Sequence, residues 1–187
     1  MINAAIFASG EGTNAENIIK YVANDTRIKI KLVVTNNETA GVVARAEKHK
    51  KNVQIISKDS LNNYADQLID FLQTEKIDLI ILAGFLLKIP EAFVKAFPNK
   101  IINIHPSLLP KFGGKGMYGM NVHRAVIASG ETESGITIHC VNEDYDKGEV
   151  ILRAKCSIQK SDTPESLAAK IHELEMENFP KAIEKLL

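Results

Sequence analysis

The chain has 187 residues, of which 45% are hydrophobic and 25% are charged, and its formal net charge at pH 7 is +0. This composition is ordinary for a globular domain with a substantial core, so we predict a single domain over residues 1–187. The balanced charge provides no general attraction to nucleic acid or to an anionic membrane surface, so we expect neither as a partner. The longest uncharged apolar run, residues 79–87, has nine residues, whereas a membrane-spanning helix needs about 20.

The cysteines and the start of the chain indicate the cellular compartment. Cys140 and Cys156 form neither a C-x-x-C pair nor a dense framework, which is typical of reduced thiols. Residues 1–8 place no basic leader before their apolar side chains, so we predict no signal peptide. Together these features predict a cytoplasmic protein.

A glycine-rich loop follows the first apolar run. Residues 4–8 are mostly apolar, residues 9–14 read Ser-Gly-Glu-Gly-Thr-Asn, and apolar residues then recur at helical spacing. Glycines allow positive φ and close backbone approach, and the start of a helix directs free amides at the loop. This order of strand, glycine loop and helix predicts a phosphate site.

Two other interpretations compete for the same loop. The spacing G-x-G-x-x-A, which begins at Gly10, matches a loose form of the dinucleotide-binding fingerprint, but the second strand ends in two asparagines instead of an acidic residue. Thr13 and Glu16 have the spacing of a capping box, and we expect one to form. A capped helix still presents other amides, so a capping box and a phosphate site are compatible.

Strands and helices alternate as far as residue 105. We predict strands over residues 28–35, 53–56, 77–83 and 100–105, and helices over residues 41–51, over residues 91–97 and from a cap at Asp59 or Ser60 to residue 74. This alternation predicts a Rossmann-like, doubly wound α/β fold with a mostly parallel sheet. Such folds bind ligands outside the carboxyl ends of their strands, so we expect Gly12, Gly84 and His105 to converge on one cleft.

Two polar side chains end the strand over residues 100–105. Side chains alternate along a strand, so Asn103 and His105 share one face, and Pro106 ends the ladder because it lacks an amide proton. Burying these polar groups costs free energy, and catalysis is one reason for the cost. A lone histidine at a strand end is more often structural, but the pair favours a functional site.

The glycine-rich segment 113–119 is either a mobile flap or a surface loop.

The rest of the chain adds a helix, a hairpin and a terminal helix. We predict a helix over residues 120–130, in which His123 has a structural role. Strands over residues 133–141 and 149–158 flank an acidic loop and form an antiparallel hairpin. One helix or more than one begins at Thr163-Pro164-Glu165 and runs to the terminus, with Pro180 as an interruption.

The motif Asn-Ile-His-Pro-Ser-Leu-Leu-Pro, residues 103–110, resembles the signature of the formyltransferases that use 10-formyltetrahydrofolate. A second shared element is Asp146, which precedes a turn and a strand containing Val-Ile-Leu; Lys147 stands where this family often has one of two glycines. The resemblance implies the formyltransferase fold, in which an antiparallel C-terminal hairpin accompanies the parallel sheet. It also implies a transferase with 10-formyltetrahydrofolate as co-substrate and no metal.

The resemblance further implies catalytic roles for Asn103, His105 and Asp146. Attack of an acceptor amine on the formyl carbon develops an oxyanion, which Asn103 and His105 would stabilise by hydrogen bonds. Asp146, paired with His105, would take the amine proton directly or through water. Ser107 as a hydrolase nucleophile is the weaker alternative, because it lacks the Gly-x-Ser-x-Gly elbow.

The glycine loop resembles the phosphate loop of the phosphoribosylglycinamide formyltransferases. This implies that Gly12, Thr13 and Asn14 bind the phosphate of glycinamide ribonucleotide, and that Glu175 contacts its ribose region, in de novo purine biosynthesis. The 187 residues leave no room for the additional domains of methionyl-tRNA formyltransferases or formyltetrahydrofolate hydrolases. The alternatives are another folate-dependent formyltransferase, such a hydrolase, or a nucleotide-binding domain without catalysis.

This family binds folate largely through the backbone of two segments. The resemblance places the folate against these residues: Phe85, Leu86, Leu87, Lys88, Ile89, His139, Val141 and Asp144. Many members have an arginine where this chain has Leu87, which implies a different contact to the glutamate tail of the folate. We expect small molecules as substrates, and a monomer or a weak homodimer.

Overall fold

The computed structural model describes residues 1–144 and 146–187, and these residues form two compact units. The first unit comprises Met1–Asn103 together with Leu187, and the second comprises Ile104–Leu186. The boundary falls inside strand β5 (Ile101–His105), directly after Asn103. The prediction of one domain over the whole chain stays a prediction.

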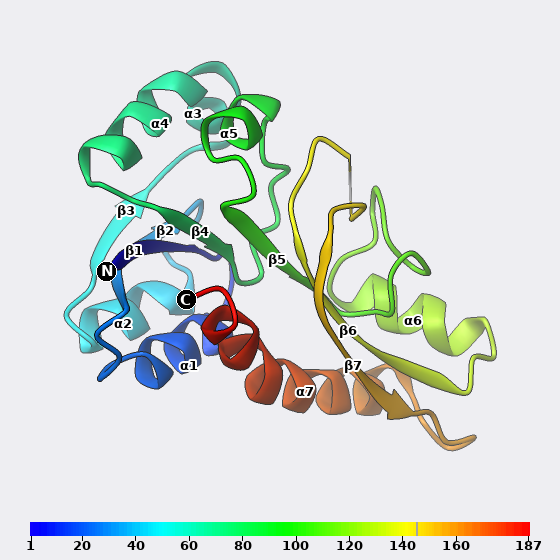
Figure 1. Ribbon diagram of the computed structural model, residues 1–187. Coiled ribbons are helices and arrows are strands. Elements are labelled where there is room, and N and C mark those ends of the chain that lie inside the picture. Colours follow the sequence, from blue (N-terminus) through cyan, green and yellow to red (C-terminus); the bar gives the residue numbers. More distant parts are fainter. Residues whose placement is uncertain (145) are drawn as a thin grey trace. The chain divides into compact units, whose positions relative to one another are not determined.

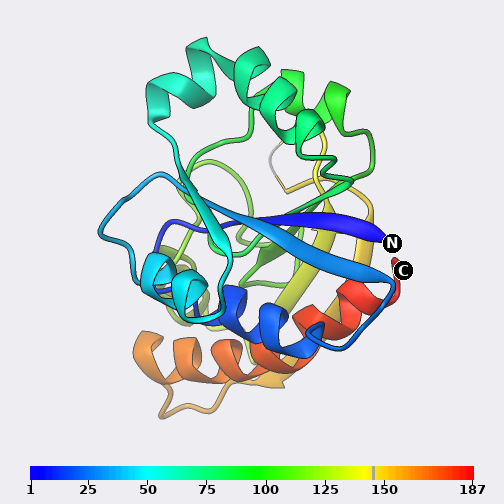
Figure 2. The same cartoon turned by 90° about the vertical axis from the view of Figure 1, so that its left-hand side faces the viewer.

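The first unit alternates strands and helices as predicted. Its other elements are β1 (Ile2–Phe7), α1 (Thr13–Tyr21), β2 (Ile28–Thr35), α2 (Gly41–Lys48), β3 (Asn52–Ile55), α3 (Lys58–Asn63), α4 (Ala65–Thr74), β4 (Leu79–Leu82) and α5 (Glu91–Ala96). The strand pairs described in this unit are parallel, in the order β3-β2-β1-β4-β5. Helices α1 and α2 lie on one face of the strands, and α3, α4 and α5 lie on the other (Figures 1 and 2).

The centre of this unit is apolar because its inner strands are covered on both faces. All four residues of β4 are buried, and so are the last four residues of β1. A near-continuous aliphatic run is what a central parallel strand requires, since neither face meets water. The unit is therefore doubly wound, and its strands end together at the edge where the loops of the predicted site begin.

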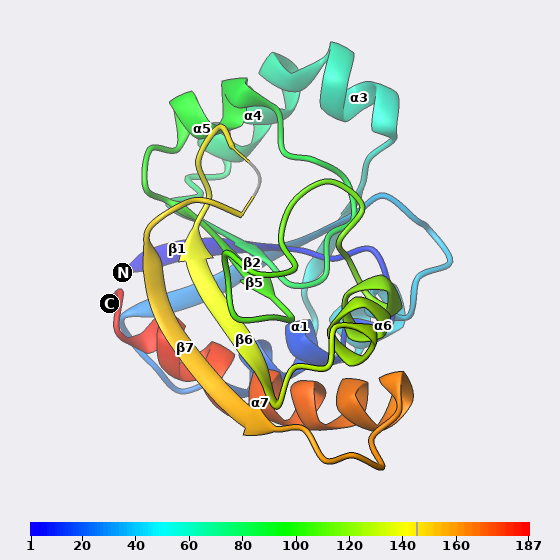
Figure 3. The same ribbon diagram turned by 90° about the vertical axis from the view of Figure 1, so that its right-hand side faces the viewer.

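The second unit contains an antiparallel strand pair and two helices (Figure 3). Strands β6 (Glu133–Cys140) and β7 (Val150–Ser157) pair along most of their length. Helix α7 (Pro164–Glu184) packs against both strands, and α6 (Met120–Ala128) packs against α7. The two predicted hairpin strands are confirmed, and position 145 of the acidic loop between them lies outside the described residues.

Three features of the helices differ from the predictions. The cap before α3 is Ser57, whose hydroxyl accepts from the N–H of Ser60 at 2.9 Å, and not Asp59 or Ser60. Tyr64 has a non-helical backbone and separates α3 from α4, where we predict one helix. Pro180 lies within α7 without interrupting it, and its ring is buried, so packing offsets the hydrogen bond that proline cannot donate.

Candidate functional site

The glycine loop of the first unit meets α1 at Gly12. Gly12 has a φ of 73° and is the N-cap of this helix. A Cβ at this position would lie 2.5 Å from the Cβ of Val42, so both the backbone conformation and the space require glycine. The first N–H groups of a helix have no partner within it, and the positive end of its dipole favours an anion. The loop therefore has the geometry of an anion site.

The predicted capping box at the start of α1 is wrong. No side chain caps this helix, and the Glu16 carboxylate pairs with Arg45 of α2 instead. His49 Nε2 lies 2.9 Å and Lys48 Nζ lies 3.3 Å from Glu16 Oε1. Hydrogen bonds from His49 and Arg45 hold the pKa of Glu16 well below its usual range. The tertiary partners of Glu16 outcompete the local cap, so no side-chain cap competes with an anion at this helix end.

Ser9 ties three loops of the first unit together. Its N–H donates to the carbonyl of Gly84 at 3.0 Å, its hydroxyl donates to Asn36 Oδ1 at 2.5 Å, and the N–H of Leu86 donates to this hydroxyl at 2.9 Å. These contacts bring the glycine loop and the Gly84 loop together, as predicted. That His105 shares their cleft stays a prediction, because His105 belongs to the second unit.

The predicted folate segment after β4 has mixed exposure. The ring of Phe85 packs edge-on against that of Phe7, with centroids 5.3 Å apart and planes at 82°. Leu86 is 57% exposed although its amide is bonded to Ser9, so its side chain offers an apolar surface on a fixed backbone. The other predicted residues are Leu87, which is half-buried, Lys88, which is exposed, and Ile89, which is buried.

In the second unit, two predicted histidines lie beside the carboxylate of Asp146. Asp146 Oδ2 lies 3.6 Å from His105 Nδ1, and Asp146 Oδ1 lies 3.7 Å from His139 Nε2. The side chains of His105 and His139 are buried, and that of Asp146 is 12% exposed. His139, predicted as a folate contact, is thus a second imidazole beside Asp146. Asn103 lies two residues before His105 on β5, at the end of the first unit, and is half-buried.

The glycine-rich segment after the motif holds Asp146 in place. The N–H of Gly114 donates to Asp146 Oδ2 at 2.8 Å. A Cβ at Gly113 would lie 3.2 Å from Asp146 Cβ and 2.6 Å from Leu109 Cδ2, so the segment packs closely there. Asp146 itself has a positive φ of 53°. The start of segment 113–119 is therefore anchored to the catalytic carboxylate that we predict.

Hydrogen bonds to carbonyls assign the tautomers of both histidines. His105 Nε2 lies 2.8 Å from the carbonyl of Phe112, and His139 Nδ1 lies 2.9 Å from the carbonyl of Cys140. A carbonyl only accepts, so each of these nitrogens carries a hydrogen. In these tautomers, His105 Nδ1 and His139 Nε2 direct lone pairs at Asp146. Burial lowers the pKa of His139, which favours the neutral form of this ring.

The other two predicted carboxylates have different surroundings. The side chain of Asp144 is 64% exposed, and its Oδ2 lies 3.3 Å from Lys147 Nζ. Glu175 on α7 is 15% exposed at its side chain, and its Oε2 lies 3.6 Å from His172 Nδ1. Hydrogen bonding to Glu175 raises the pKa of His172. Val141, the last of the predicted folate contacts, is half-buried.

His123 is a residue whose surroundings the sequence does not reveal. It is 6% exposed on α6, and its Nδ1 is buried without a hydrogen-bond partner in the described part of the chain. Burial lowers the pKa of His123, the charge of Glu175 raises it, and that of His105 lowers it. His123 therefore lies within the electrostatic reach of two predicted site residues. In the sequence, the only indication of these surroundings is that His123 falls on the buried side of a helix.

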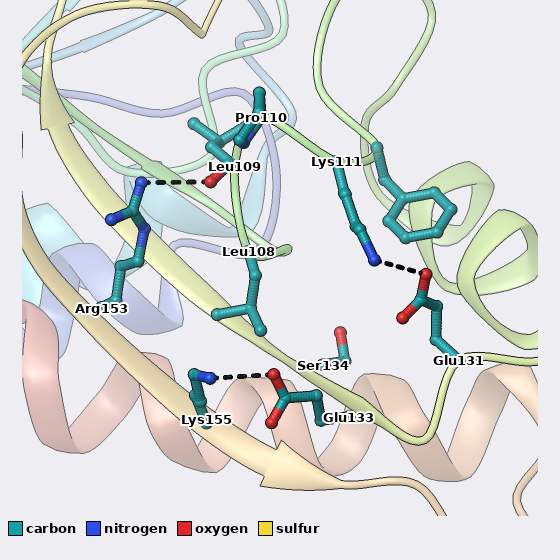
Figure 4. Close-up of a pocket in the computed structure, with 10 residues that line it drawn as sticks. Leu108, Leu109, Pro110, Lys111, Glu131, Glu133, Ser134, Arg153 and Lys155 are labelled. Atoms are coloured by element: carbon teal, nitrogen blue, oxygen red, sulfur yellow. Dashed lines mark hydrogen bonds and ion pairs between the residues drawn. The ribbon is translucent and has the colours of Figure 1, made fainter.

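A separate cavity of about 270 Å³ lies in the second unit (Figure 4). Leu108 and its neighbours provide an apolar wall, and the ion pairs Lys111–Glu131 and Lys155–Glu133, each 2.8 Å long, lie along it. Each lysine is already neutralised by a carboxylate, and none of the predicted site residues lines this cavity. It is distinct from the His105 and Asp146 pair.

Two classes of feature are not found in residues 1–144 and 146–187. No group of three or more His, Cys, Asp or Glu residues there is arranged to hold a metal ion. None of the helices described has both the length and the apolar character that crossing a membrane requires.

Comparisons with known proteins match along the whole chain. A family model described as formyl transferase matches residues 2–183. The chloroplastic phosphoribosylglycinamide formyltransferase of Arabidopsis thaliana is 40% identical over 174 residues, which cover 89% of this chain but only 59% of the plant protein. The phosphoribosylglycinamide formyltransferase of Haemophilus influenzae is 36% identical, over 98% of this chain and 86% of the relative.

Solved structures agree with the predicted fold class. The crystal structure of phosphoribosylglycinamide formyltransferase from Bacillus halodurans matches with a TM-score of 0.90 at 34% identity, over 99% of this chain and 95% of that chain. This match confirms an α/β fold of the formyltransferase type, mostly parallel with antiparallel strands toward the carboxyl end.

Proposed function

Because the chain belongs to the formyl transferase family, we propose that it transfers the formyl group of 10-formyltetrahydrofolate to the amine of glycinamide ribonucleotide, in de novo purine biosynthesis. The observation that carries this proposal is the Asp146 carboxylate, 3.6 Å from the buried imidazole of His105. The name of the Haemophilus influenzae relative, of which this chain covers 86%, supports the choice of acceptor.

The amine of the ribonucleotide is the nucleophile, so the enzyme needs none of its own. As the amine nitrogen bonds to the formyl carbon, the formyl oxygen becomes an oxyanion, which Asn103 and His105 stabilise by hydrogen bonds. This role requires the Nε2–H of His105 to leave the carbonyl of Phe112. Asp146 accepts the proton that leaves the amine, directly or through a water. The bond from the formyl carbon to the folate nitrogen then breaks, and that nitrogen receives the proton that Asp146 accepted, which returns Asp146 to its carboxylate form. The products are the formylated amine and tetrahydrofolate.

The neutral state of His139 supports this division of roles. A second charged imidazole beside Asp146 would compete with His105 for the carboxylate. Burial is the largest influence on the pKa of His139 and lowers it, although the Cys140 carbonyl and Asp146 act in the opposite direction, so His139 favours the neutral ring. The two imidazoles therefore differ in role although they lie at similar distances from the carboxylate.

The substrate contacts follow from the same proposal. Gly12, Thr13 and Asn14 bind the phosphate at the positive end of α1, as a helix start favours. Glu175 contacts the ribose region. The folate contacts comprise residues 85–89 together with His139, Val141 and Asp144. Small molecules are then the only substrates, and a resident metal has no role in the reaction.

The proposed setting is the cytoplasm, with the protein as a monomer or a weak homodimer. Both cysteines carry free thiols, which suits a reducing compartment. Burial raises the pKa of Cys140 and Cys156, which keeps their thiols protonated and less reactive.

The direct test follows release of tetrahydrofolate from 10-formyltetrahydrofolate with glycinamide ribonucleotide, with methionyl-tRNA, and with water alone. We expect turnover with the ribonucleotide only, and a folded His105→Ala variant measures the background. Release with water alone would indicate a hydrolase, and formylation of the tRNA would indicate another formyltransferase. Binding of the ribonucleotide without turnover would indicate a nucleotide-binding domain.

A further inference from the structure

Helix α2 holds the backbone of the glycine loop from one side. The N–H of Val42 donates to the carbonyl of Gly10 at 3.1 Å, and Arg45 Nε donates to the carbonyl of Glu11 at 2.7 Å. A Cβ at Gly41 would lie 3.1 Å from Glu11 Cα, so α2 packs directly on the loop. Two consecutive carbonyls of the loop are therefore directed at α2.

The direction of these carbonyls determines the direction of the loop amides. Within a trans peptide unit, the C=O and the N–H point in opposite directions. The unit that carries the Glu11 carbonyl also carries the N–H of Gly12, so a carbonyl held toward α2 turns this N–H away from α2. The contact from Val42 to Gly10 does the same for the N–H of Glu11. Consecutive amides on one side of a turn form an anion-binding concavity.

The guanidinium of Arg45 is itself fixed by a second partner. Its Nη1 pairs with Glu16 Oε2, and the side chain of Glu16 is only 7% exposed, against 34% for Arg45. Glu16 lies in the first turn of α1, so Arg45 joins the loop carbonyl to the helix that the loop precedes. A guanidinium presents its N–H groups in a rigid fork and can serve both acceptors at fixed angles, whereas a lysine ammonium acts as one compact charge.

From this geometry we propose that Arg45 is a positioning residue for the phosphate site. It keeps the peptide between Glu11 and Gly12 in the orientation that directs the Gly12 amide at the phosphate of the ribonucleotide. Its Nε and Nη1 contacts go to protein acceptors, so its effect passes through the loop. The inference rests on the proposed function, which puts the phosphate at residues 12–14.

The test compares Arg45→Met with Lys48→Met in the full-length protein. Both variants remove one positive charge that pairs with Glu16, but only Arg45 contacts the loop. A hydrogen bond to a charged group typically changes an equilibrium by about 10-fold to 100-fold. We expect Arg45→Met to raise the Michaelis constant for glycinamide ribonucleotide by about this factor. The constant for folate and the turnover number should stay within about 2-fold, as should all three values in Lys48→Met.

A second readout separates positioning from stability. In a titration with inorganic phosphate, we expect the NMR amide signal of Gly12 to shift saturably in the wild type and in Lys48→Met. In Arg45→Met the shift should need about 10-fold more phosphate, and Arg45→Lys should restore it only in part.

The outcomes distinguish two failures. Equal phosphate affinity in folded Arg45→Met and wild type would overturn the role of Arg45. A wild-type Gly12 signal that responds to neither phosphate nor the ribonucleotide would overturn the phosphate site, and with it the proposed function. If Arg45→Met folds poorly, Arg45→Lys decides, since it keeps the charge, and wild-type affinity there would also overturn the proposal.

Discussion

The two units prepare their predicted sites by different means. In the first unit the functional groups at Gly12 are backbone amides, and their direction follows from the contacts that α2 makes to the loop carbonyls. In the second unit they are side chains, with His105 and His139 lying 3.6 and 3.7 Å from Asp146. A backbone site responds to whatever redirects a peptide or adds a Cβ. A side-chain site loses activity when one titratable group is removed.

The largest expected effect is on the side-chain site, from Asp146→Asn. This change keeps the shape but removes the base, so turnover should fall by ~10²-fold or more. The matched control is Asp144→Asn two residues earlier, where the side chain is 64% exposed and the change should be mild. Both are measured at saturating substrates after thermal unfolding confirms the fold. A severe loss in Asp144→Asn with a mild one in Asp146→Asn would move the catalytic carboxylate to position 144.

His105→Ala and Asn103→Ala should come next. Each removes a proposed donor to the oxyanion, so each turnover number should fall by at least ~10²-fold. His105 is buried and bonded to the carbonyl of Phe112, so its variant is also checked for folding by circular dichroism. Near-normal turnover in either folded variant removes that residue from the mechanism.

The backbone site should be broken by Gly12→Ala. The added Cβ meets Val42, and the φ of 73° strains any L residue, so the peptide must turn and the amide with it. We expect the Michaelis constant for the ribonucleotide to rise by at least ~10-fold, with a much smaller change for folate. Gly10→Ala is the control, because a Cβ there has no neighbour within 4 Å. Equal effects on both substrates would indicate misfolding instead of a lost phosphate contact.

A smaller effect is expected from Ser9→Ala, because Ser9 connects the glycine loop to the predicted folate segment. It removes the hydroxyl that serves Asn36 and the N–H of Leu86, and we expect a loss of about 1–3 kcal/mol in the free energy of unfolding. Both Michaelis constants should rise several-fold, because the hydroxyl joins the glycine loop to the folate segment. Ser129→Ala, which removes one hydroxyl bond to the carbonyl of Val126, should leave both constants unchanged. A change in only one constant would show that the segments act independently.

The smallest effect concerns the buried histidines and the pH dependence of stability. Burial lowers the pKa of His123 and of His139 below the ordinary 6.5. At these two positions the unfolded chain binds protons that the folded chain does not, so their contribution to the free energy of unfolding should fall as the pH drops below about 6.5. His172, whose pKa is raised, contributes in the opposite direction. Denaturant titrations at pH 7 and below measure this slope, and His123→Gln should reduce it. An unchanged slope in that variant would assign the effect to His139 alone.

Local patterns predicted most of the elements and the motif residues. The aliphatic run of β4, the glycine loop before α1 and the alternation in β5 each depend on neighbours within a few residues, so periodicity and turn chemistry are sufficient. The same local reasoning failed at Glu16, where a capping box is expected from spacing. A distant arginine and histidine satisfy that carboxylate better than the adjacent amide does.

The sequence alone therefore identifies the groups available: a glycine loop at a helix start, an Asn and a His on one strand face, and an Asp before a turn. Their partners depend on the tertiary fold. Three contacts illustrate this: His139 lies beside Asp146, Arg45 donates to the carbonyl of Glu11, and the hydroxyl of Ser9 accepts from the N–H of Leu86. The joined positions are 7, 34 and 77 residues apart. Each of these contacts forms because the fold brings together segments that are separated along the chain. Periodicity reports only which face a side chain occupies, and not which distant group that face meets.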